Sequence, residues 1–536
     1  MSVTLSREQF NSTVEQARGR WPDATLAIPL SVRLLGDQLT PVLAYRRLVV
    51  EDERTATSFL FESVEGGERQ GRHSILGAHP DIKVIATANE VRVCRRDTDG
   101  GWQVETQTST DPLEVTRDIT RTWKLIIPDG RAGALLPTAP LTGWIGHASY
   151  DAVRYAEPEK LPWRDAPPDD RQLPDLHFGL YREIVVFDHV DKIVHVVRCA
   201  VVTPGADADA SYDDACAGLR QTTEALQVHS KPLRAGEVHE ASASPDAISN
   251  MTREQHAAMV ERAREYIRAG DIFQVVIGQR FERVSTVDPF DVYRALRVVN
   301  PSPYMVYLQS EGCILVASSP EILCRVRRRS EDSSLVVTNR PLAGTRRRGR
   351  SPEEDAALER ELLADAKERA EHVMLVDLGR NDVGKVAERG TIDLAAIMDI
   401  ERYSHVMHIS STVTGVLRDG LDAWDALRAT LPVGTISGAP KIRAMQIIDE
   451  LEPIRRGPYG GGFGYIGLDG QMDVALALRT IVTPTALYSD GRWTYHAQAA
   501  GGIVHDSRAD AEYAETVNKA AALLRAIDLA EQAFRA

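Results

Sequence analysis

Two pairs of glutamates could place four carboxylates around one cation. Glu368 and Glu371 are three residues apart, and so are Glu512 and Glu515. Residues three apart share one face of a helix, and converging carboxylates repel unless a proton or cation lies between them. Mg²⁺ prefers oxygen ligands and keeps waters for an anionic substrate. The spacing therefore suggests a magnesium site, although each pair alone is also typical of a solvated helix face.

Polar residues also interrupt apolar stretches that resemble strands. They are Gln274 in Ile272–Ile277, His408 in Val406–Ile409 and Arg479 in Ala475–Val482. Each could be a satisfied core residue. Arg479 is the hardest to explain in this way, because a buried guanidinium needs a carboxylate or phosphate partner.

A literal GxGxxG occurs at Gly462–Gly467. A dinucleotide-binding fingerprint needs a strand before it and a helix after it. Here further glycines precede the motif, and the strand-like stretch Val474–Val482 follows a turn. The motif therefore indicates a close backbone approach to another ligand or a plain glycine-rich turn.

Several elements can be predicted around these residues. Thr252 and Gln255 form a capping box for a helix that Gly270 closes. Ser351 and Pro352 begin a helix that runs to about Leu378, with room for a break. Further helices are expected near Ala439-Pro440 and over Ala509–Phe534, and strands over Ile82–Ala86, Glu90–Cys94, Glu183–Phe187 and Ile193–Val197. Because strands and helices alternate without a regular βαβ pattern, we predict an α+β fold.

A composition shift divides the chain. The stretch Gly236–Asn250 is typical of a linker. We therefore predict an N-terminal domain over residues 1–249, ending in this linker, and a C-terminal domain over residues 250–536.

Composition excludes several classes of function. The chain has 536 residues, with 63 Lys and Arg against 77 Asp and Glu, a net charge of −14. This balance argues against nucleic-acid binding, which needs a basic face. Five well-separated cysteines without a CxxC argue against a disulfide framework or a zinc site. No apolar leader or membrane-length apolar run occurs. We expect no membrane association and a reducing cytoplasm.

Ordered motifs along nearly the whole chain resemble those of chorismate-utilising enzymes, and most specifically those of anthranilate synthase component I. The motifs are Leu39–Pro41, Phe61–Ser63, Asn300–Met305, Ser319–Glu321, Pro341–Thr345, Glu368–His372, Arg380–Asp382, Leu431–Lys441 and Ile503–Ser507. The resemblance implies antiparallel sheets packed together with flanking helices in two intertwined domains, the C-terminal one binding chorismate. It also implies conversion of chorismate and ammonia to anthranilate and pyruvate, the first committed step of tryptophan biosynthesis.

The resemblance also implies roles for individual residues. Mg²⁺ would be held by Glu371 and Glu515, supported by Glu368 and Glu512. The catalytic residues would be Glu321 as the acid, His408, Thr435 and Gln274. Chorismate would be bound by Gly344, Thr345, Tyr459, Arg479, Ala500, Gly501, Gly502 and Lys519.

Partners and regulation follow from the same resemblance. No cysteine lies in a Gly-x-Cys-x-Gly turn, so ammonia would come from glutamine through a separate amidotransferase subunit, component II. A pocket contributed by the N-terminal domain would bind tryptophan as a feedback inhibitor. Its residues would be Glu62, Ser63, Pro303, Tyr304 and Met305.

Two positions distinguish relatives with other products. Relatives that add water carry Lys where this chain has Gln274, and relatives that form 4-amino products carry a nucleophilic Lys where it has Ala343. Both positions favour ammonia addition at C2. The alternatives are an aminodeoxychorismate or isochorismate/salicylate synthase, or a non-catalytic subunit that binds tryptophan. The chain departs from the usual pattern with Ala500 in place of Gly and Gly278 in place of Ser.

Overall fold

The computed structural model describes residues 2–49, 56–65, 69–97, 99–228, 233–238, 247–403 and 406–534. Two large sheets, almost entirely antiparallel, dominate the described part of the chain. In the first sheet the strands follow the order β14 (Ile248–Ser249), β15 (Gln274–Ser285), β27 (Trp493–Ile503), β26 (Thr480–Pro484), β17 (Cys313–Ser319), β16 (Tyr304–Ser310), β2 (Ser58–Glu62), β5 (His73–Ala78), β12 (Glu183–Asp188), β13 (Ile193–Val202), β1 (Thr25–Leu35) and β9 (Trp123–Leu125), with β23 (Gly438–Ala439) on β15. Only β1 and β9 pair in parallel within the described residues.

The second sheet is formed by the strands β20 (Leu342–Arg347), β22 (Val406–Val416), β19 (Leu335–Asn339), β18 (Ile322–Arg328), β25 (Met472–Leu476), β24 (Gly462–Gly467), β10 (Gly143–Ala148), β11 (Leu176–Tyr181), β6 (Ile82–Thr87), β7 (Glu90–Arg96) and β8 (Trp102–Thr108), with β21 (Asp393–Arg402) on β22. A separate short hairpin joins β3 (Val64–Glu65) and β4 (Arg69–Gln70). Both large sheets contain strands from before residue 249 and after residue 250. The halves of the chain are therefore intertwined, as expected, while the domain division itself stays a prediction.

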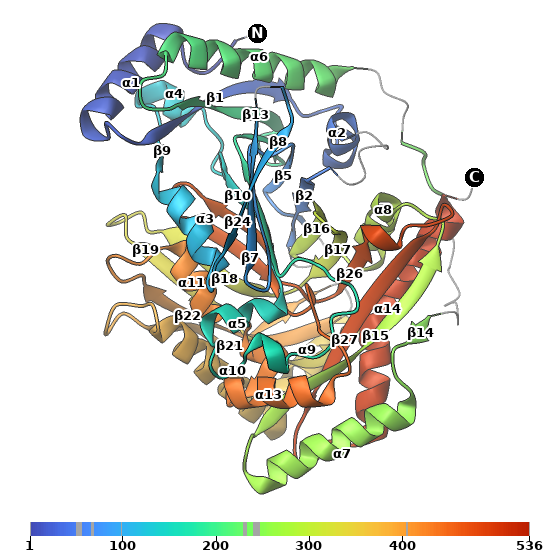
Figure 1. Ribbon diagram of the computed structural model, residues 1–536. Helices are drawn as coiled ribbons and strands as arrows, with labels where there is room; N and C mark the ends of the chain where they lie inside the picture. Colours follow the sequence, from blue (N-terminus) through green and yellow to red (C-terminus); the bar gives the residue numbers. More distant parts are fainter. Residues whose placement is uncertain are drawn as a thin grey trace.

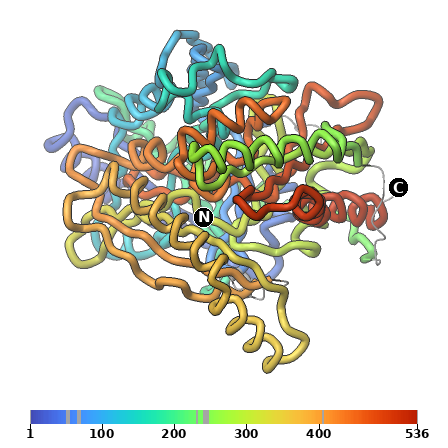
Figure 2. Tube along the Cα trace, turned by 90° about the horizontal axis from the view of Figure 1, so that it is seen from below, coloured from blue at the N-terminus to red at the C-terminus, as the bar shows by residue number. Residues whose placement is uncertain are grey.

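Helices cover the outer faces of the sheets. They are α1 (Arg7–Arg20), α2 (Pro41–Leu48), α3 (Pro112–Arg121), α4 (Gly130–Ala134), α5 (Val153–Ala156), α6 (Ala208–Gln227), α7 (Arg253–Ala269), α8 (Pro289–Val299), α9 (Pro352–Ala364), α10 (Ala366–Gly384), α11 (Ala423–Thr430), α12 (Gly434–Ser437), α13 (Lys441–Leu451) and α14 (Ala509–Ala533). Helices α1 and α6 lie together beside β1 and β13, whereas α7 runs beside α14 at the other side of the molecule (Figures 1 and 2).

Apolar side chains fill three layers. One cluster lies between the two sheets and joins residues such as Phe59 and Val306 of the first sheet to Tyr181 and Phe463 of the second. Two larger clusters lie on the outer faces, where the helices pack. This order of helices, sheet, sheet and helices explains why the strands are buried on both faces and do not alternate cleanly in the sequence.

Most predicted elements are confirmed, with informative differences. The capping box of Thr252 begins α7, and Gly270 ends it in the left-handed region with φ 84°. The helix predicted after Ser351 is two helices: Asp365 ends α9, and its side chain accepts hydrogen bonds from the first turn of α10. α10 then continues to Gly384, six residues beyond the predicted end. Of the predicted linker, residues 239–246 lie outside the described residues, and its end forms β14.

The GxGxxG segment is neither a turn nor a phosphate loop. It is strand β24, paired on one side with β10 and on the other with β25. A side chain at Gly464 would lie 2.1 Å from the Asp473 carbonyl oxygen. The glycine therefore permits close pairing of the strands.

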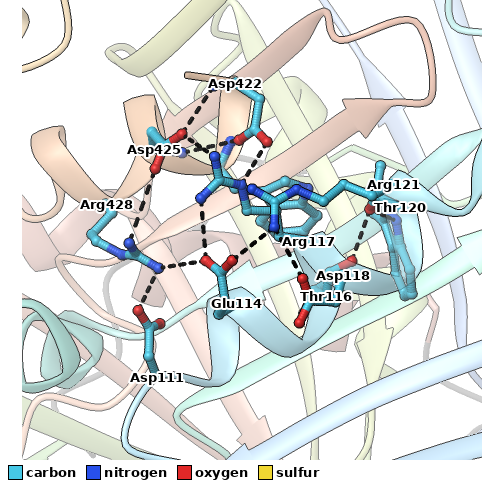
Figure 3. A network of polar contacts seen from close by, with 12 residues as sticks. Asp111, Glu114, Thr116, Arg117, Asp118, Thr120, Arg121, Asp422, Asp425 and Arg428 are labelled. Carbon is cyan, nitrogen blue, oxygen red and sulfur yellow. Dashed lines mark hydrogen bonds and ion pairs between the residues drawn. The ribbon is translucent and has the colours of Figure 1, made fainter. Parts of the chain in front are cut away.

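An ion-pair network joins the two halves of the chain (Figure 3). Arg117 of α3 lies 2.7 Å from a carboxylate oxygen of Asp422 and 2.7 Å from one of Asp425, at the start of α11. Arg428, at the other end of α11, pairs with Asp111. Because α11 leads directly into the Leu431–Lys441 motif, this network positions that motif against the second sheet.

The run of three arginines at residues 346–348 and the five cysteines are all accounted for by contacts within the protein. Arg346, Arg347 and Arg348 each pair with carboxylates on or beside α9 and α10, so the basic run is neutralised within the protein. All five cysteines are free and buried. Among the described helices, none is both long and apolar enough to cross a membrane.

Candidate functional site

A cavity of about 350 Å³ brings together the residues predicted for chorismate, Mg²⁺ and catalysis. It is lined from α10, α12, α14, β15, β20, β22 and β27, which are far apart in the sequence. Fifteen of the sixteen predicted residues line it: Gln274, Glu321, Gly344, Thr345, Glu368, Glu371, His408, Thr435, Tyr459, Arg479, Ala500, Gly502, Glu512, Glu515 and Lys519. The exception, Gly501, lies against the Glu512 carboxylate instead. Their individual roles stay predictions.

One wall of the cavity is an unpaired strand edge. β15 pairs with β27 from Trp493 to Ile503, whereas β26 pairs with β27 only at His496 and Ala497. Beyond Ala497 the second edge of β27 has no strand partner among the described residues, and residues of this segment line the cavity. Backbone N–H and C=O groups at such an edge need hydrogen-bond partners, which a ligand can supply.

Arg479 lies where β26 and β27 separate. It falls between β25 and β26 and is not part of a strand, so the single strand expected over Val474–Val482 is wrong. Its φ of 45° places it in the left-handed region of backbone conformation, which is unfavourable for every residue except glycine. Such strained residues cluster at functional sites. Its guanidinium makes a hydrogen bond of 3.4 Å with Asn300 Oδ1, and no carboxylate of the described residues pairs with it. Burial lowers the pKa of Arg479, which an anionic ligand would reverse.

Glu321 is a buried acid facing the same cavity. Its side chain accepts a 2.9 Å hydrogen bond from Thr435 Oγ1, at the start of α12. Burial raises the pKa of Glu321 to about 8, so the carboxyl group is largely protonated at neutral pH. This protonation state is the one required of a general acid.

His408 is held in one tautomer. Its Nδ1 lies 3.0 Å from the Gly344 carbonyl oxygen, so Nδ1–H donates and Nε2 keeps its lone pair. Burial lowers the pKa of His408 to about 4, and the ring is therefore neutral. Gly344 itself has a φ of 70°, a conformation that a side chain would disfavour.

The four glutamates meet the requirements of a hard cation. Burial raises the pKa of Glu368, and the charge of Glu371 adds to this rise; burial likewise raises the pKa of Glu512, with Glu515 contributing. The buried Glu512 Oε2 has no hydrogen-bond partner. Within the described part of the chain, no three acidic, histidine or cysteine side chains are already gathered closely enough to hold a metal ion. The donor set consists of oxygens alone and includes one orphaned oxygen, which is the kind of set that Mg²⁺ prefers.

Neighbouring groups restrain these glutamates. Gln274 Nε2 donates a 2.8 Å hydrogen bond to Glu371 Oε1, and Lys519 Nζ pairs with Glu515 at 2.7 Å while donating to the Ala500 carbonyl oxygen at 2.9 Å. A side chain at Gly502 would lie 2.6 Å from Gln274 Nε2. A side chain at this position would therefore displace the amide of Gln274 from its present place beside Glu371.

The two departures from the family pattern lie opposite each other. Gly278 of β15 pairs in register with Ala500 of β27. A side chain at Gly278 would lie 2.9 Å from the Ala500 methyl group. The Ala499 carbonyl oxygen would lie closer still, at 2.5 Å, so the backbone of β27 as well as the Ala500 methyl group leaves no room for a side chain at Gly278.

A second cavity, of about 630 Å³, contains most of the predicted tryptophan residues. Glu62, Ser63, Pro303 and Tyr304 line it, whereas Met305 does not and is buried in a core cluster. Met305 points to the opposite face of β16 from Tyr304 and packs in the cluster that contains the apolar residues of α8. Glu62, its register partner on β2, also reaches α8, through Tyr293 and Arg297.

The Glu62 carboxylate is already engaged. Arg297 lies 2.8 Å from one of its oxygens, and the Tyr293 hydroxyl donates a 2.6 Å hydrogen bond. A ligand ammonium would therefore share this carboxylate with Arg297.

Some residues of both cavities were given no role from the sequence, although Gln498 begins the family motif Gln498–Gly502. Lys367 and Gln498 line the first cavity, while Arg325, Arg327 and Asp473 line the second. Gln498 shows the same signal as Gln274, a polar residue within an apolar strand. The other residues carry no local signal, because charged residues are ordinary on a surface.

The fold and the cavity define a chorismate-binding enzyme, and the comparison with known families agrees. Residues 57–525 match the model of the chorismate binding enzyme family, and the chain belongs to this family.

Within this family, the most similar proteins with known names include anthranilate synthases. The chain is 53% identical over 525 residues to anthranilate synthase alpha subunit 1, chloroplastic, of Oryza sativa subsp. japonica, covering 95% of this chain and 89% of that protein. The crystal structure of anthranilate synthase component I from Streptococcus pneumoniae matches with a TM-score of 0.69 and 35% identity, over 92% of this chain and 99% of that one. The menaquinone-specific isochorismate synthase of Escherichia coli shares the fold, with a TM-score of 0.62 and 17% identity over 97% of this chain and 100% of that one.

Proposed function

We propose that this chain is the chorismate-converting component of an anthranilate synthase, a lyase that forms anthranilate and pyruvate from chorismate and ammonia. The observation that carries the proposal is the cavity itself. A protonated acid, Glu321, and an Arg479 without a carboxylate partner face the same space as four glutamates. A dicarboxylate with a leaving hydroxyl group matches this arrangement.

Substrate binding would use both ends of the cavity. Arg479, with the hydroxyl group of Tyr459 nearby in the cavity wall, would bind one carboxylate of chorismate. The ring carboxylate would face Glu371 and Glu515, the proposed Mg²⁺ ligands. A bound Mg²⁺ would neutralise the ring carboxylate and withdraw electrons from the ring. The part of β27 without a strand partner would lie along the substrate between these ends.

The first step would replace the C4 hydroxyl group. The nitrogen of ammonia forms a bond to C2, and both ring double bonds shift, from C1=C2 to C1=C6 and from C5=C6 to C4=C5. The C4–O bond breaks as the second double bond forms. Glu321 donates its proton to the departing hydroxyl group, which leaves as water. Thr435 holds this carboxyl group in place, and the nitrogen then loses a proton to the surroundings.

The second step would remove pyruvate. The bond between C3 and the ether oxygen breaks, C2 loses its proton, and the enolpyruvyl group takes up a proton and leaves as pyruvate. The neutral imidazole of His408 has a free Nε2 for accepting the C2 proton. The ring becomes aromatic, which drives the step to anthranilate.

Two residues favour ammonia over water or a covalent intermediate. Gln274 lies at the metal end of the cavity and cannot act as a base toward water, and Ala343, also in the cavity wall, cannot act as a nucleophile. Since the isochorismate synthase fold is shared, these side chains rather than the fold would decide the product.

Ammonia would come from a partner amidotransferase, the component II that the relatives' names imply. Burial raises the pKa of Cys199, Cys313 and Cys324 to about 12. These three thiols are therefore unsuited to attack glutamine, and all five cysteines are buried away from a substrate in solution.

Tryptophan would inhibit by binding the second cavity. Pro320 and Leu342 line both cavities, and Tyr304 pairs in register with Ser319, two residues before Glu321. A ligand that displaces Tyr304 would therefore shift the strand end that carries the acid, and linkage requires chorismate to weaken tryptophan binding equally.

A direct assay tests the function. The chain is mixed with chorismate, MgCl₂ and an ammonium salt at pH 8, and anthranilate fluorescence and pyruvate are measured. We expect equimolar anthranilate and pyruvate, abolished by EDTA. Isochorismate, a 4-amino product or no turnover would contradict the proposal.

A further inference from the structure

Gln498 is a pocket residue without a structural role. Its side chain is 94% buried, since 6% of its surface is exposed, and it lines the chorismate cavity. Its Oε1 accepts no hydrogen bond, and no hydrogen bond between described residues involves its amide group. A buried amide oxygen without a donor costs roughly 1–3 kcal/mol of stability. An apolar side chain of similar volume would pack as well, so the amide is explained by a ligand.

The strand geometry places Gln498 beside Arg479. Ile481 with Ala497 is the last pair before β26 and β27 separate. Gln498 is the next residue on β27, and Arg479 lies two residues before Ile481 on the other chain segment. The two side chains therefore flank the point at which the edge of β27 opens.

The same geometry separates Gln498 from the glutamates. Gln498, Ala500 and Gly502 share one face of β27, and Gly502 lies at the end where Gln274 meets Glu371. Four residues of strand span about 13 Å. Gln498 is therefore at the end of the cavity opposite the proposed Mg²⁺ ligands. The nearest basic residue across the sheet, Arg280, is engaged by both carboxylate oxygens of Asp170.

We infer that Gln498 is a further substrate-binding residue, whose Nε2–H group donates a hydrogen bond to the enolpyruvyl carboxylate of chorismate while its Oε1 accepts one from the Arg479 guanidinium that holds the same carboxylate. The inference rests on the proposed function. An amide beside a guanidinium adds a neutral donor without adding charge, which suits a single carboxylate. The ring carboxylate at the other end would not be contacted.

The test compares the wild-type chain with Gln498→Met, which keeps volume and removes the amide, and with Gln498→Glu, which keeps shape and adds a negative charge. The matched control is Thr483→Val, because Thr483 Oγ1 is also buried without a partner on the same sheet but outside both cavities. Kinetics are measured with ammonium salt as the nitrogen source. Gln498→Met should raise the KM for chorismate roughly 10- to 100-fold, with kcat and the KM for ammonia within threefold and Tm unchanged or higher.

Inhibition by each of the two products shows which part of chorismate Gln498 contacts. Pyruvate inhibition should weaken at least tenfold in Gln498→Met while anthranilate inhibition stays within twofold, and Gln498→Glu should be the more impaired variant. Thr483→Val should match the wild type. An unchanged KM in Gln498→Met, a fall in Tm together with kcat, or a selective loss of anthranilate inhibition would each overturn the inference. Absence of anthranilate from the wild-type chain would instead refute the proposed function.

Discussion

Replacing Glu321 by glutamine should make the protein more stable at alkaline pH and nearly inactive. The reason is the burial of this acid, which raises its pKa from 4.5 to about 8. A group with a raised pKa stabilises the folded protein below its unfolded-state pKa, and this contribution is lost as the pH rises toward the folded-state pKa. Glutamine keeps the shape and the hydrogen bond with Thr435 but does not ionise.

The magnitude follows from the pKa shift. Each pKa unit corresponds to about 1.4 kcal/mol, so the full shift amounts to about 5 kcal/mol. Between pH 6 and pH 9 wild-type protein should lose about 3 kcal/mol from this group, because titration ends near pH 8. Glu321→Gln should lose none of it. Urea unfolding of both proteins at pH 6 and pH 9 gives the change in unfolding free energy with pH for each protein, and the two changes are then compared.

Activity supplies the second measurement. At pH 7, about nine tenths of Glu321 is protonated if its pKa is near 8. Loss of the acid should lower kcat by about 10²–10⁴-fold, with the KM for chorismate little changed. In wild-type protein kcat at saturating free ammonia should fall above about pH 8. Equal pH dependence of stability in the two proteins, or near-normal turnover by the variant, would refute this assignment.

Other residues give shorter tests. Glu371→Gln and Glu515→Gln should each lower Mg²⁺-dependent turnover at least 100-fold with unchanged Tm, because each removes one carboxylate oxygen ligand. Turnover that stays low in both variants as Mg²⁺ is raised would agree with the assignment of these residues as ligands. Normal turnover of either variant at low Mg²⁺ would refute that assignment. Arg479→Lys should raise the KM for chorismate at least tenfold, since a lysine cannot form the bidentate contact; an unchanged KM would contradict carboxylate binding there. Gln274→Lys should divert product toward water addition, seen by chromatography, and unchanged anthranilate yield would count against this explanation of specificity. Ser63→Phe should fill part of the second cavity and weaken tryptophan inhibition at least tenfold at nearly constant ammonia-dependent rate; equal inhibition would place the regulatory site elsewhere.

Local sequence determined the elements whose signals are short-range. The capping box at Thr252, the cap at Ser351 and the short runs rich in Val and Ile predicted real helices and strands, because capping and apolar runs are features of a few neighbouring residues. Family motifs also named fifteen residues that converge on one cavity. These motifs keep their identity in the sequence even though they are scattered along it.

Tertiary structure alone decided where the strands end and what each side chain meets. The sequence does not show that β26 leaves β27 after Ala497, that Arg479 adopts a left-handed backbone, or that Gly278 faces Ala500. It also does not show that Arg297 already neutralises Glu62, or that Met305 faces the core. These features depend on pairing between segments up to hundreds of residues apart. Burial, which sets the pKa of Glu321, arises only when those segments pack together.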